Sequence, residues 1–315
     1  QNSSDQPSDY SWREIAKATL TFAATVSKAS VVPKVNKKKK IAWVSPLPPE
    51  KSGISYYTLD LSCNLSQEYE CTFICGCPEK SRKKIPWLNT ESYNWLRKNH
   101  ELFDHIIYNV GNSHFHIEIF SLLSAIPGHV ILHDVYIGGI FLSQTENSPQ
   151  LLINQAIYSH GLAKICQEKS DQSSLFWTHS SNRAVLERAI SVCVHSGHAL
   201  DLIRRDYEHC TDWNNTKEKL QRLHHPRNVS HGAIEDLYRR LLDSGNKDKL
   251  FSFVTLGIAG EAKLTKEIVR AWISSEPWRM SNCQLIIAGE YEDAFKNDDL
   301  YEEALSKRVV FTGWL

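Results

Sequence analysis

The chain has no excess of either charge. Its 315 residues include 36 lysines and arginines and 36 aspartates and glutamates, so the formal net charge at pH 7 is zero. A neutral chain has no overall basic field that would attract nucleic acid or an anionic membrane, although local patches are still possible. Two basic patches occur, at residues 37–40 and 82–84. We interpret both as solvated loop or linker charge beside buried strands, and we expect no nucleic-acid partner.

The sequence also lacks any long apolar run. No segment approaches the roughly 18 apolar residues that a membrane-spanning helix needs. Asp5 and Asp9 stand where a signal peptide would be basic. We therefore expect no integral membrane segment and a cytoplasmic location.

Cysteine is sparse and irregularly spaced, with eight residues in the chain. This pattern excludes a disulfide scaffold. Cys71, Cys75 and Cys77 cluster, but they lack the paired CxxC spacing of a structural zinc site. Their alternation with apolar residues favours a strand, so we predict reduced core thiols and no metal site.

What the sequence contains is an alternation of short apolar strands and helical stretches. The predicted strands are residues 41–44, 71–75, 105–110, 129–132 and 190–194, and the predicted helices begin near residue 53 or span residues 115–125 and 151–167. This alternation predicts a parallel sheet covered on both faces. A second series has strands at 250–254, 284–288 and 309–312 and a helix at 263–274. Because a doubly wound domain usually has five or six strands, the second series is incomplete as written.

These patterns divide the chain into three regions. Residues 1–35 hold one amphipathic helix, which starts at a capping box at residues 11–14, and a linker. Residues 39–245 form a first Rossmann-like domain that ends in a polar, irregular stretch from about residue 211. Residues 249–315 form part of a second one. The predicted fold class is α/β with two Rossmann-like units.

The loops at the carboxyl ends of the predicted strands carry the candidate site residues. Ser52 and Gly53 follow the first strand, and a glycine at that helix start lets the backbone approach a phosphate. The segment is not a GxGxxG fingerprint, which argues against an NAD enzyme. Ligands of open α/β sheets bind at these carboxyl ends. The residues that follow two further strands are Asn112, His116, His133 and Asp134.

Taken in order, these segments resemble a known family. Residues 52–54, 108–116 and 127–134 resemble the N-terminal domain of glycosyltransferase family 4, which comprises retaining sugar transferases of the GT-B fold. Gly257, Lys263 and residues 285–290 and 310–313 are similar to the opening of that family's C-terminal domain. The resemblance covers about residues 39–315 and is weak at 140–175 and 208–248.

The resemblance implies an enzyme that moves a sugar from a nucleotide diphosphate sugar to a hydroxyl acceptor such as a saccharide. It implies that Gly53 approaches the donor diphosphate, that His133 is the catalytic residue facing the sugar, and that Lys263 neutralises the leaving diphosphate. The family works without a metal ion, and we expect no cofactor. The remaining acceptor or cleft candidates are Ser52, Asn112, His116 and Asp134.

Two departures from the family pattern are visible. Ile258 and Leu264 stand where the family often has arginine, and the family's pair of spaced glutamates would lie beyond Leu315. We therefore expect this chain to be truncated within the C-terminal domain and inactive alone. Residues 9–16 resemble the family's closing helix, which points to covalent neighbours in a tandem protein. Two alternatives stay open: an inactive GT-B-like module that binds saccharide or protein, and a sugar-nucleotide epimerase of similar fold.

Non-catalytic interpretations of the histidines also stay open. His133 could be a strand-end residue bonded to Asp134, and His116 could pack at or cap a helix start. His114 and His116 do not share a helix face, which argues against a metal pair. His195 follows a predicted strand, and we assign it no catalytic role.

Overall fold

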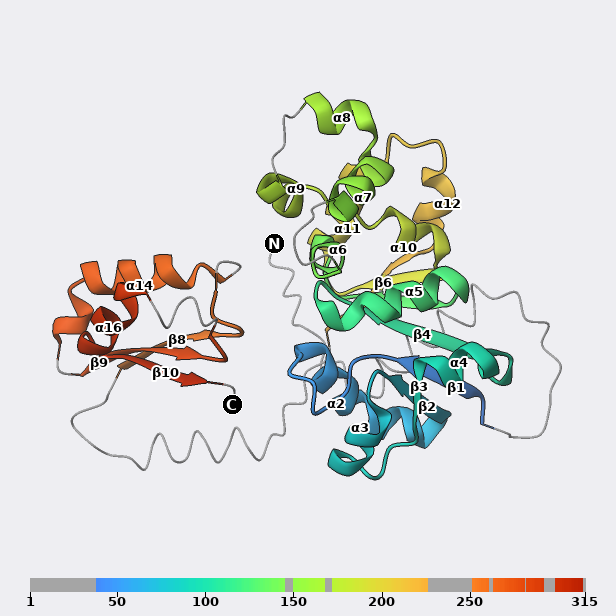
Figure 1. The fold of residues 1–315 in the computed structure, drawn as a ribbon, viewed down its shortest axis with the longest axis horizontal. Helices are drawn as coiled ribbons and strands as arrows, with labels where there is room; N and C mark the ends of the chain where they lie inside the picture. Colours follow the sequence, from blue (N-terminus) through green and yellow to red (C-terminus); the bar gives the residue numbers. More distant parts are fainter. Residues whose placement is uncertain are drawn as a thin grey trace, which may run out of the picture. The chain divides into compact units, whose positions relative to one another are not determined.

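The protein is described by a computed structural model for residues 38–144, 150–167, 172–225, 251–260, 263–280, 282–291 and 298–313. The chain divides into two compact units, Gln1–Asn228 and Val229–Leu315. Figure 1 shows the elements of each unit, coloured along the chain. The helix and linker predicted for residues 1–35 lie outside the described residues.

The first unit is built on a parallel seven-stranded sheet in the order β3-β2-β1-β4-β5-β6-β7. The strands are β1 (Lys40–Val44), β2 (Glu70–Cys75), β3 (Thr90–Ser92), β4 (His105–Val110), β5 (His129–Leu132), β6 (Ser191–Val194) and β7 (Leu220–Arg222). All five predicted strands are present, with bounds that agree to within one residue. The edge strands β3 and β7 were not predicted because each is only three residues long and mostly polar.

Helices connect these strands. They are α2 (Gly53–Glu68), α3 (Pro78–Lys84), α4 (Tyr93–Asn99), α5 (Ile117–Ala125), α6 (Gly138–Leu142), α7 (Gln150–His160), α8 (Leu162–Gln167), α9 (Gln172–Thr178), α10 (Arg183–Arg188), α11 (Gly197–Tyr207) and α12 (Trp213–Glu218), with 3-10 turns η1 (His100–Leu102) and η2 (His114–His116). The single helix predicted over 151–167 is wrong: Gly161, at φ +86°, separates α7 from α8. The region after residue 211, expected to be irregular, contains α12 and β7.

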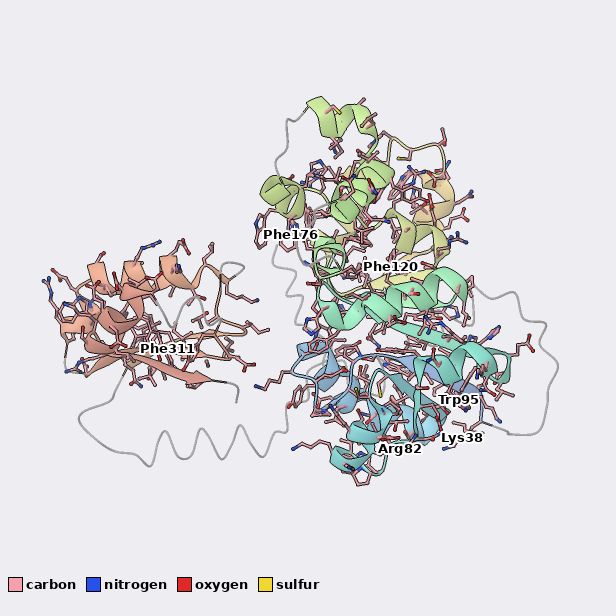
Figure 2. All side chains as sticks on the ribbon, in the orientation of Figure 1. Lys38, Arg82, Trp95, Phe120, Phe176 and Phe311 are labelled. Carbon is pink, nitrogen blue, oxygen red and sulfur yellow. The ribbon has the colours of Figure 1, made fainter. Side chains whose placement is uncertain are left out.

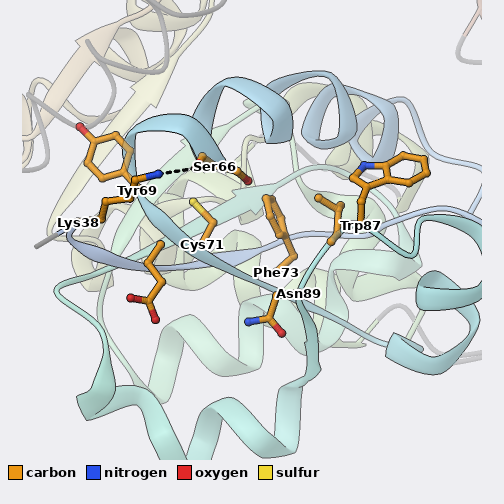
Figure 3. A pocket seen from close by; sticks show the side chains of 9 residues that line it. Lys38, Ser66, Tyr69, Cys71, Phe73, Trp87 and Asn89 are labelled. Atoms are coloured by element: carbon orange, nitrogen blue, oxygen red, sulfur yellow. Dashed lines mark hydrogen bonds between the residues drawn. The ribbon is translucent and has the colours of Figure 1, made fainter.

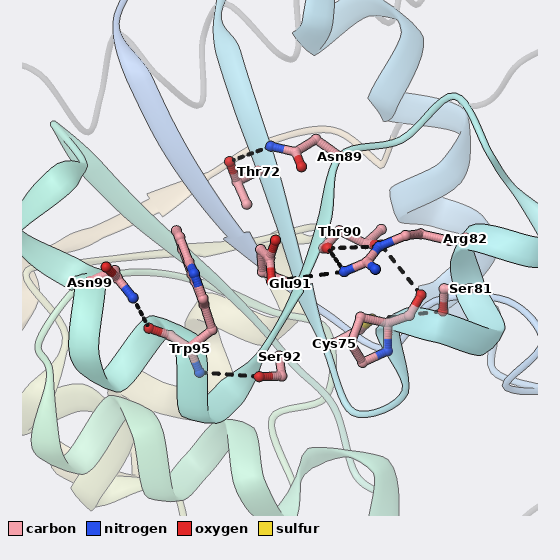
Figure 4. Close-up of polar contacts among 11 residues, drawn as sticks. Thr72, Cys75, Ser81, Arg82, Asn89, Thr90, Glu91, Ser92, Trp95 and Asn99 are labelled. Carbon is pink, nitrogen blue, oxygen red and sulfur yellow. Dashed lines mark hydrogen bonds and ion pairs between the residues drawn. The ribbon is translucent and has the colours of Figure 1, made fainter.

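The basic patch at residues 82–84 is helical rather than a loop, because it forms the last turn of α3. Cations are favourable at that end of a helix. Arg82 also donates to the carbonyl of Thr90 at 2.8 Å and to its hydroxyl at 3.2 Å, and its guanidinium lies 3.8 Å from the carboxylate of Glu91 (Figure 4). Arg82 therefore fastens α3 to the edge strand β3. Lys37 of the other patch lies outside the described residues.

The sheet is buried on both faces, as alternate residues of β1 show. Ile41 and Trp43 pack on one face with α2, and Ala42 and Val44 pack on the other with helices that include α5. All four side chains are fully buried. Figure 2 shows the side chains between the layers, including Phe120 of α5. Two hydrophobic layers thus hold the strand ends in fixed positions.

The order of the strands reverses between β1 and β4. From β1 the chain continues to β2 on one side, and from β4 it continues to β5 on the other. The loops that follow β1 and β4 therefore diverge at their carboxyl ends. In open α/β sheets this switch point is where ligands bind.

The second unit is a smaller parallel sheet in the order β10-β9-β8. Its elements are β8 (Phe251–Leu256), α14 (Thr265–Ser274), η4 (Pro277–Arg279), β9 (Cys283–Ala288), α16 (Asp299–Ser306) and β10 (Val309–Gly313). The three strands and the helix predicted here are confirmed, whereas α16 was not predicted. Val269, Trp272 and Ile287 belong to its separate core, against which Phe311 packs (Figure 2).

All eight cysteines are free thiols. Cys71 and Cys75 lie in β2, as predicted, and Cys75 is buried. The core position predicted for Cys77 is wrong, because Cys77 is exposed just beyond the strand, at the N-cap of α3. Among the helices that the structure describes, none combines the length and apolar character needed to cross a bilayer.

Candidate active site

The first part of the candidate site is the N-terminus of α2, which follows β1 after a short loop. Ser52 is the N-cap, and its Oγ accepts a hydrogen bond from the Ile54 amide at 3.2 Å. Gly53 is the first helical residue. Its φ lies outside the left-handed region, and a Cβ added there would meet no atom within 4 Å. Neither packing nor backbone conformation therefore requires a glycine at this position. The space beside its backbone can admit an anion at the positive end of the helix.

At Gly111, directly after β4, side chains from three other parts of the chain come close to the backbone. A Cβ on Gly111 would lie directly against Cδ1 of Ile54, 2.9 Å from Nε2 of His116 and 3.2 Å from Oδ2 of Asp134. Only glycine leaves room for these three side chains. The structure therefore brings the start of α2 together with two of the predicted cleft residues.

Asn112 and Asp134 join the loops that follow β4 and β5. The Asn112 amide donates to Oδ2 of Asp134 at 3.0 Å, and Oδ1 of Asn112 accepts from the Gly139 amide at 2.6 Å. Asp134 is exposed and Asn112 is half-buried. These two predicted residues hold the wall of the site in place.

His133 follows β5 and is held by β4. Its amide donates to the Val110 carbonyl at 2.8 Å, and its Nε2–H donates to Oδ1 of the fully buried Asn109, also at 2.8 Å. The ring's partner is thus Asn109 rather than Asp134, the partner considered from the sequence. Burial, together with neighbouring imidazoles such as His195, holds the pKa of His133 well below its usual value, so the ring is neutral at pH 7.

His116 is also held by Asn109. Its Nδ1–H donates to the Asn109 carbonyl at 3.1 Å, and its Nε2 has no hydrogen-bond partner among the described residues. Burial lowers the pKa of His116 to about 4. His116 is the buried N-cap residue of α5, as the helix-start interpretation expects, but its side chain makes no capping hydrogen bond. Asn109 was not singled out from the sequence because it is one polar residue within a buried strand.

Three aromatic side chains without an assigned role gather with His133. The ring centroid of Tyr57 lies 4.7 Å from that of His133, and the centroid of His195 lies 5.0 Å from it. The ring of His225 lies 4.8 Å from that of His195 and 5.2 Å from that of Tyr57. The sequence showed that His195 follows a predicted strand. It gave no such signal for His225, because the strand before it, β7, was not predicted. Imidazoles in such a group can donate or accept protons and can bind metal ions.

Lys263 belongs to the second unit and is exposed between β8 and α14. Its Cε lies 3.2 Å from the position that a Cβ would occupy on Gly257, so the lysine passes over this glycine, whose φ is +116°. The N-cap residue of α14, Leu264, makes no side-chain capping bond. The lysine and the first amides of this helix form a second group suited to an anion.

A cavity of about 580 Å³ lies at the opposite, amino end of the first sheet (Figure 3). It is lined by residues before and at the start of β2 and β3, among them Tyr69, Cys71, Trp87 and Asn89. Lys38 spans one side and donates to the Ser66 carbonyl at 3.0 Å. None of the predicted site residues lines it.

No protein-family profile matches the sequence, and no curated protein is similar to it. The doubly covered parallel sheet and the second, smaller parallel sheet form an α/β, Rossmann-like fold of the GT-B type. Among solved structures, the chain is similar to HepE of Anabaena, crystallised with UDP and glucose, with a TM-score of 0.50 and 11% identity. That alignment covers 88% of this chain and 70% of HepE.

A second solved structure aligns over a similar length. WaaG, a glycosyltransferase involved in lipopolysaccharide biosynthesis, matches with a TM-score of 0.49 and 12% identity, over 87% of this chain and 70% of WaaG. At 11% identity the likeness to HepE shows the fold alone.

Proposed function

We propose that the protein is a glycosyltransferase that moves a sugar, with retention, from a nucleotide diphosphate sugar to a hydroxyl acceptor such as a saccharide. The observation that carries this proposal is that α2, which begins at the open position of Gly53, places the ring of Tyr57 4.7 Å from that of His133 at the carboxyl edge of the first sheet. An anion-binding backbone and a neutral imidazole at one edge suit a diphosphate and the sugar attached to it. The solved complex of HepE makes UDP the first nucleotide to test.

In this proposal each predicted residue has a role. The Gly53 backbone approaches the diphosphate, His133 contacts the transferring sugar, and Lys263 neutralises charge on the leaving diphosphate. Bond cleavage at the anomeric carbon leaves negative charge on the diphosphate, so cationic and amide donors must already be aimed there. Ser52, Asn112, His116 and Asp134 shape the cleft.

Membership of family 4 is part of the same proposal and rests on the motif order. In that family two spaced glutamates hold the donor, and we propose that such residues outside 1–315 complete donor binding here. We also propose a metal-independent transfer and a cytoplasmic location. The exposed free thiols of Cys63, Cys77 and Cys166 suit a reducing compartment.

Nucleotide binding is the first test. Calorimetry with UDP, GDP and ADP, on this chain and on one extended past Leu315, should detect binding of at least one nucleotide to the extended chain. The expected affinity of the 1–315 chain is lower, and it should show no turnover. Failure of all three nucleotides to bind the extended chain would sink the proposal.

Gly53→Ala tests the place of the diphosphate. Because the added Cβ enters open space, stability should stay within about 0.5 kcal/mol of wild type, while nucleotide affinity falls several-fold. Gly197→Ala is the matched control: Gly197 follows the N-cap Ser196 as the first residue of α11, and its Cβ would come no closer than 3.7 Å to Arg222. Equal nucleotide affinity in the two variants would contradict the assignment.

His133→Gln tests the chemistry. It should lower turnover while nucleotide binding persists, because His133 is assigned to the sugar and not to the diphosphate. NMR of the product anomer checks retention. Product analysis with a labelled sugar nucleotide separates transfer from epimerisation, and binding without any product would favour the non-enzymatic module.

A further inference from the structure

Three histidines converge from neighbouring strands at the carboxyl edge of the first sheet. His133 follows β5, His195 follows β6 and His225 lies beyond β7, and these strands are adjacent in the sheet. One ring nitrogen from each lies within 4.8 Å of the others. His133 and His195 are half-buried at the ends of core strands, whereas His225 is exposed.

His195 and His133 each use one ring nitrogen in a hydrogen bond to a neighbouring oxygen. Nδ1–H of His195 donates to the Leu223 carbonyl at 3.2 Å, so the lone pair is on Nε2, a buried atom without a hydrogen-bond partner among the described residues. Nε2–H of His133 donates to Asn109 at 2.8 Å, which leaves the lone pair on Nδ1. A carbonyl acceptor on the remote ring nitrogen is the arrangement that orients metal-ligating histidines.

One aromatic side chain packs against the whole cluster. The ring of Tyr57 packs against all three imidazoles, with centroid distances of 4.7 to 5.5 Å. Imidazole nitrogen is a common ligand of zinc and of other divalent transition metals.

We propose that His133, His195 and His225 form a three-imidazole binding site for a divalent transition-metal ion, of which Zn²⁺ is the best match. Zinc sites with three protein ligands leave a fourth position to water. Imidazole nitrogens about 2.0–2.1 Å from zinc lie roughly 3.4 Å apart in a tetrahedron, so the rings must close by about 1.5 Å or less. Because His225 is exposed, its side chain can rotate toward the other two rings.

The site has a consequence for the proposed transferase without depending on it. An ion held by His133 occupies the ring assigned to the sugar, so zinc should inhibit transfer rather than support it. Metal binding and nucleotide binding are measured separately, so failure of either leaves the other standing.

The test is a Co²⁺ titration of the chelator-treated chain. Tetrahedral Co²⁺ with nitrogen ligands gives visible d–d bands, which should saturate at one ion per chain and disappear when Zn²⁺ is added. His195→Gln and His225→Gln should each weaken Co²⁺ binding about tenfold or more. His224→Gln is the matched control, because this adjacent histidine is exposed and outside the cluster.

Circular dichroism and thermal unfolding establish that the variants are folded. His225→Gln is the decisive variant, since an exposed loop side chain tolerates substitution. Absence of d–d bands in the folded wild-type chain would overturn the proposal. Unchanged binding in folded His225→Gln, or equal weakening in His224→Gln, would overturn it too.

Discussion

Gly289, directly after β9, has almost no space around it. A Cβ there would lie directly against the carbonyl group of Gly257, and the residue has φ +143°. Both conditions exclude a side chain. The two glycines thus let the loop after β9 pass over the loop that leads to Lys263.

Gly289→Ala should therefore destabilise the second unit by about 1–3 kcal/mol or more, because it adds backbone strain as well as a clash. Urea unfolding followed by tryptophan fluorescence measures the change. Gly53→Ala provides the comparison, since its Cβ meets open space. A Gly289→Ala protein as stable as Gly53→Ala would contradict the observed approach of the two loops.

At the scale of single elements, α4 shows how a short helix is fixed by its cap. Ser92 is both the last residue of β3 and the N-cap of α4. Its Oγ accepts a hydrogen bond from the Trp95 amide at 3.1 Å (Figure 4). Ser92→Ala should lower the free energy of unfolding by about 1 kcal/mol, measured by urea titration. Ser124→Ala should change it by less than about 0.5 kcal/mol, because Ser124 is an exposed serine that bonds back to Phe120 within α5. Equal effects would argue against the cap.

Elements with long apolar runs were predictable, and short polar ones were not. The strand at residues 105–110 was predicted with its observed bounds, since six consecutive buried residues leave little ambiguity. The strand Leu220–Arg222 was missed because its three residues gain strand structure only by pairing with β6. Gly161 was not recognised as the end of α7, because a glycine within a helical pattern is often tolerated.

At the scale of the whole molecule, buried histidines make stability depend on pH. His129 of β5 faces His105 of β4, with ring centroids 5.3 Å apart, and bonds to the hydroxyl of Ser191 of β6 at 2.8 Å. Burial, together with the charge of His105, lowers the pKa of His129 to about 4. Burial likewise lowers the pKa of His105, where Lys39 adds to the effect and Asp104 opposes it.

An unfolded histidine binds a proton near pH 6.5, whereas folded His129 does so only near pH 4. The contribution of neutral His129 to the free energy of unfolding is therefore fully present above pH 6.5. It is lost as the pH drops from 6.5 toward 4, and the loss amounts to up to about 3 kcal/mol at the lower limit. Urea unfolding at pH 7.5, 6 and 5 measures the slope. His129→Gln should reduce it, and the exposed-site variant His198→Gln should not. A slope unaffected by His129→Gln would count against this account.

The sequence by itself determined the alternation of strands and helices, the two Rossmann-like series and the loops that carry Gly53, His133 and Lys263. These features depend on periodicity and on residues close together in the chain. Only the tertiary structure decided that Asn109 holds both His133 and His116, and that His195 and His225 join them. The physical reason is strand pairing: the parallel order β5-β6-β7 brings together side chains from distant parts of the chain, and no local spacing encodes that order.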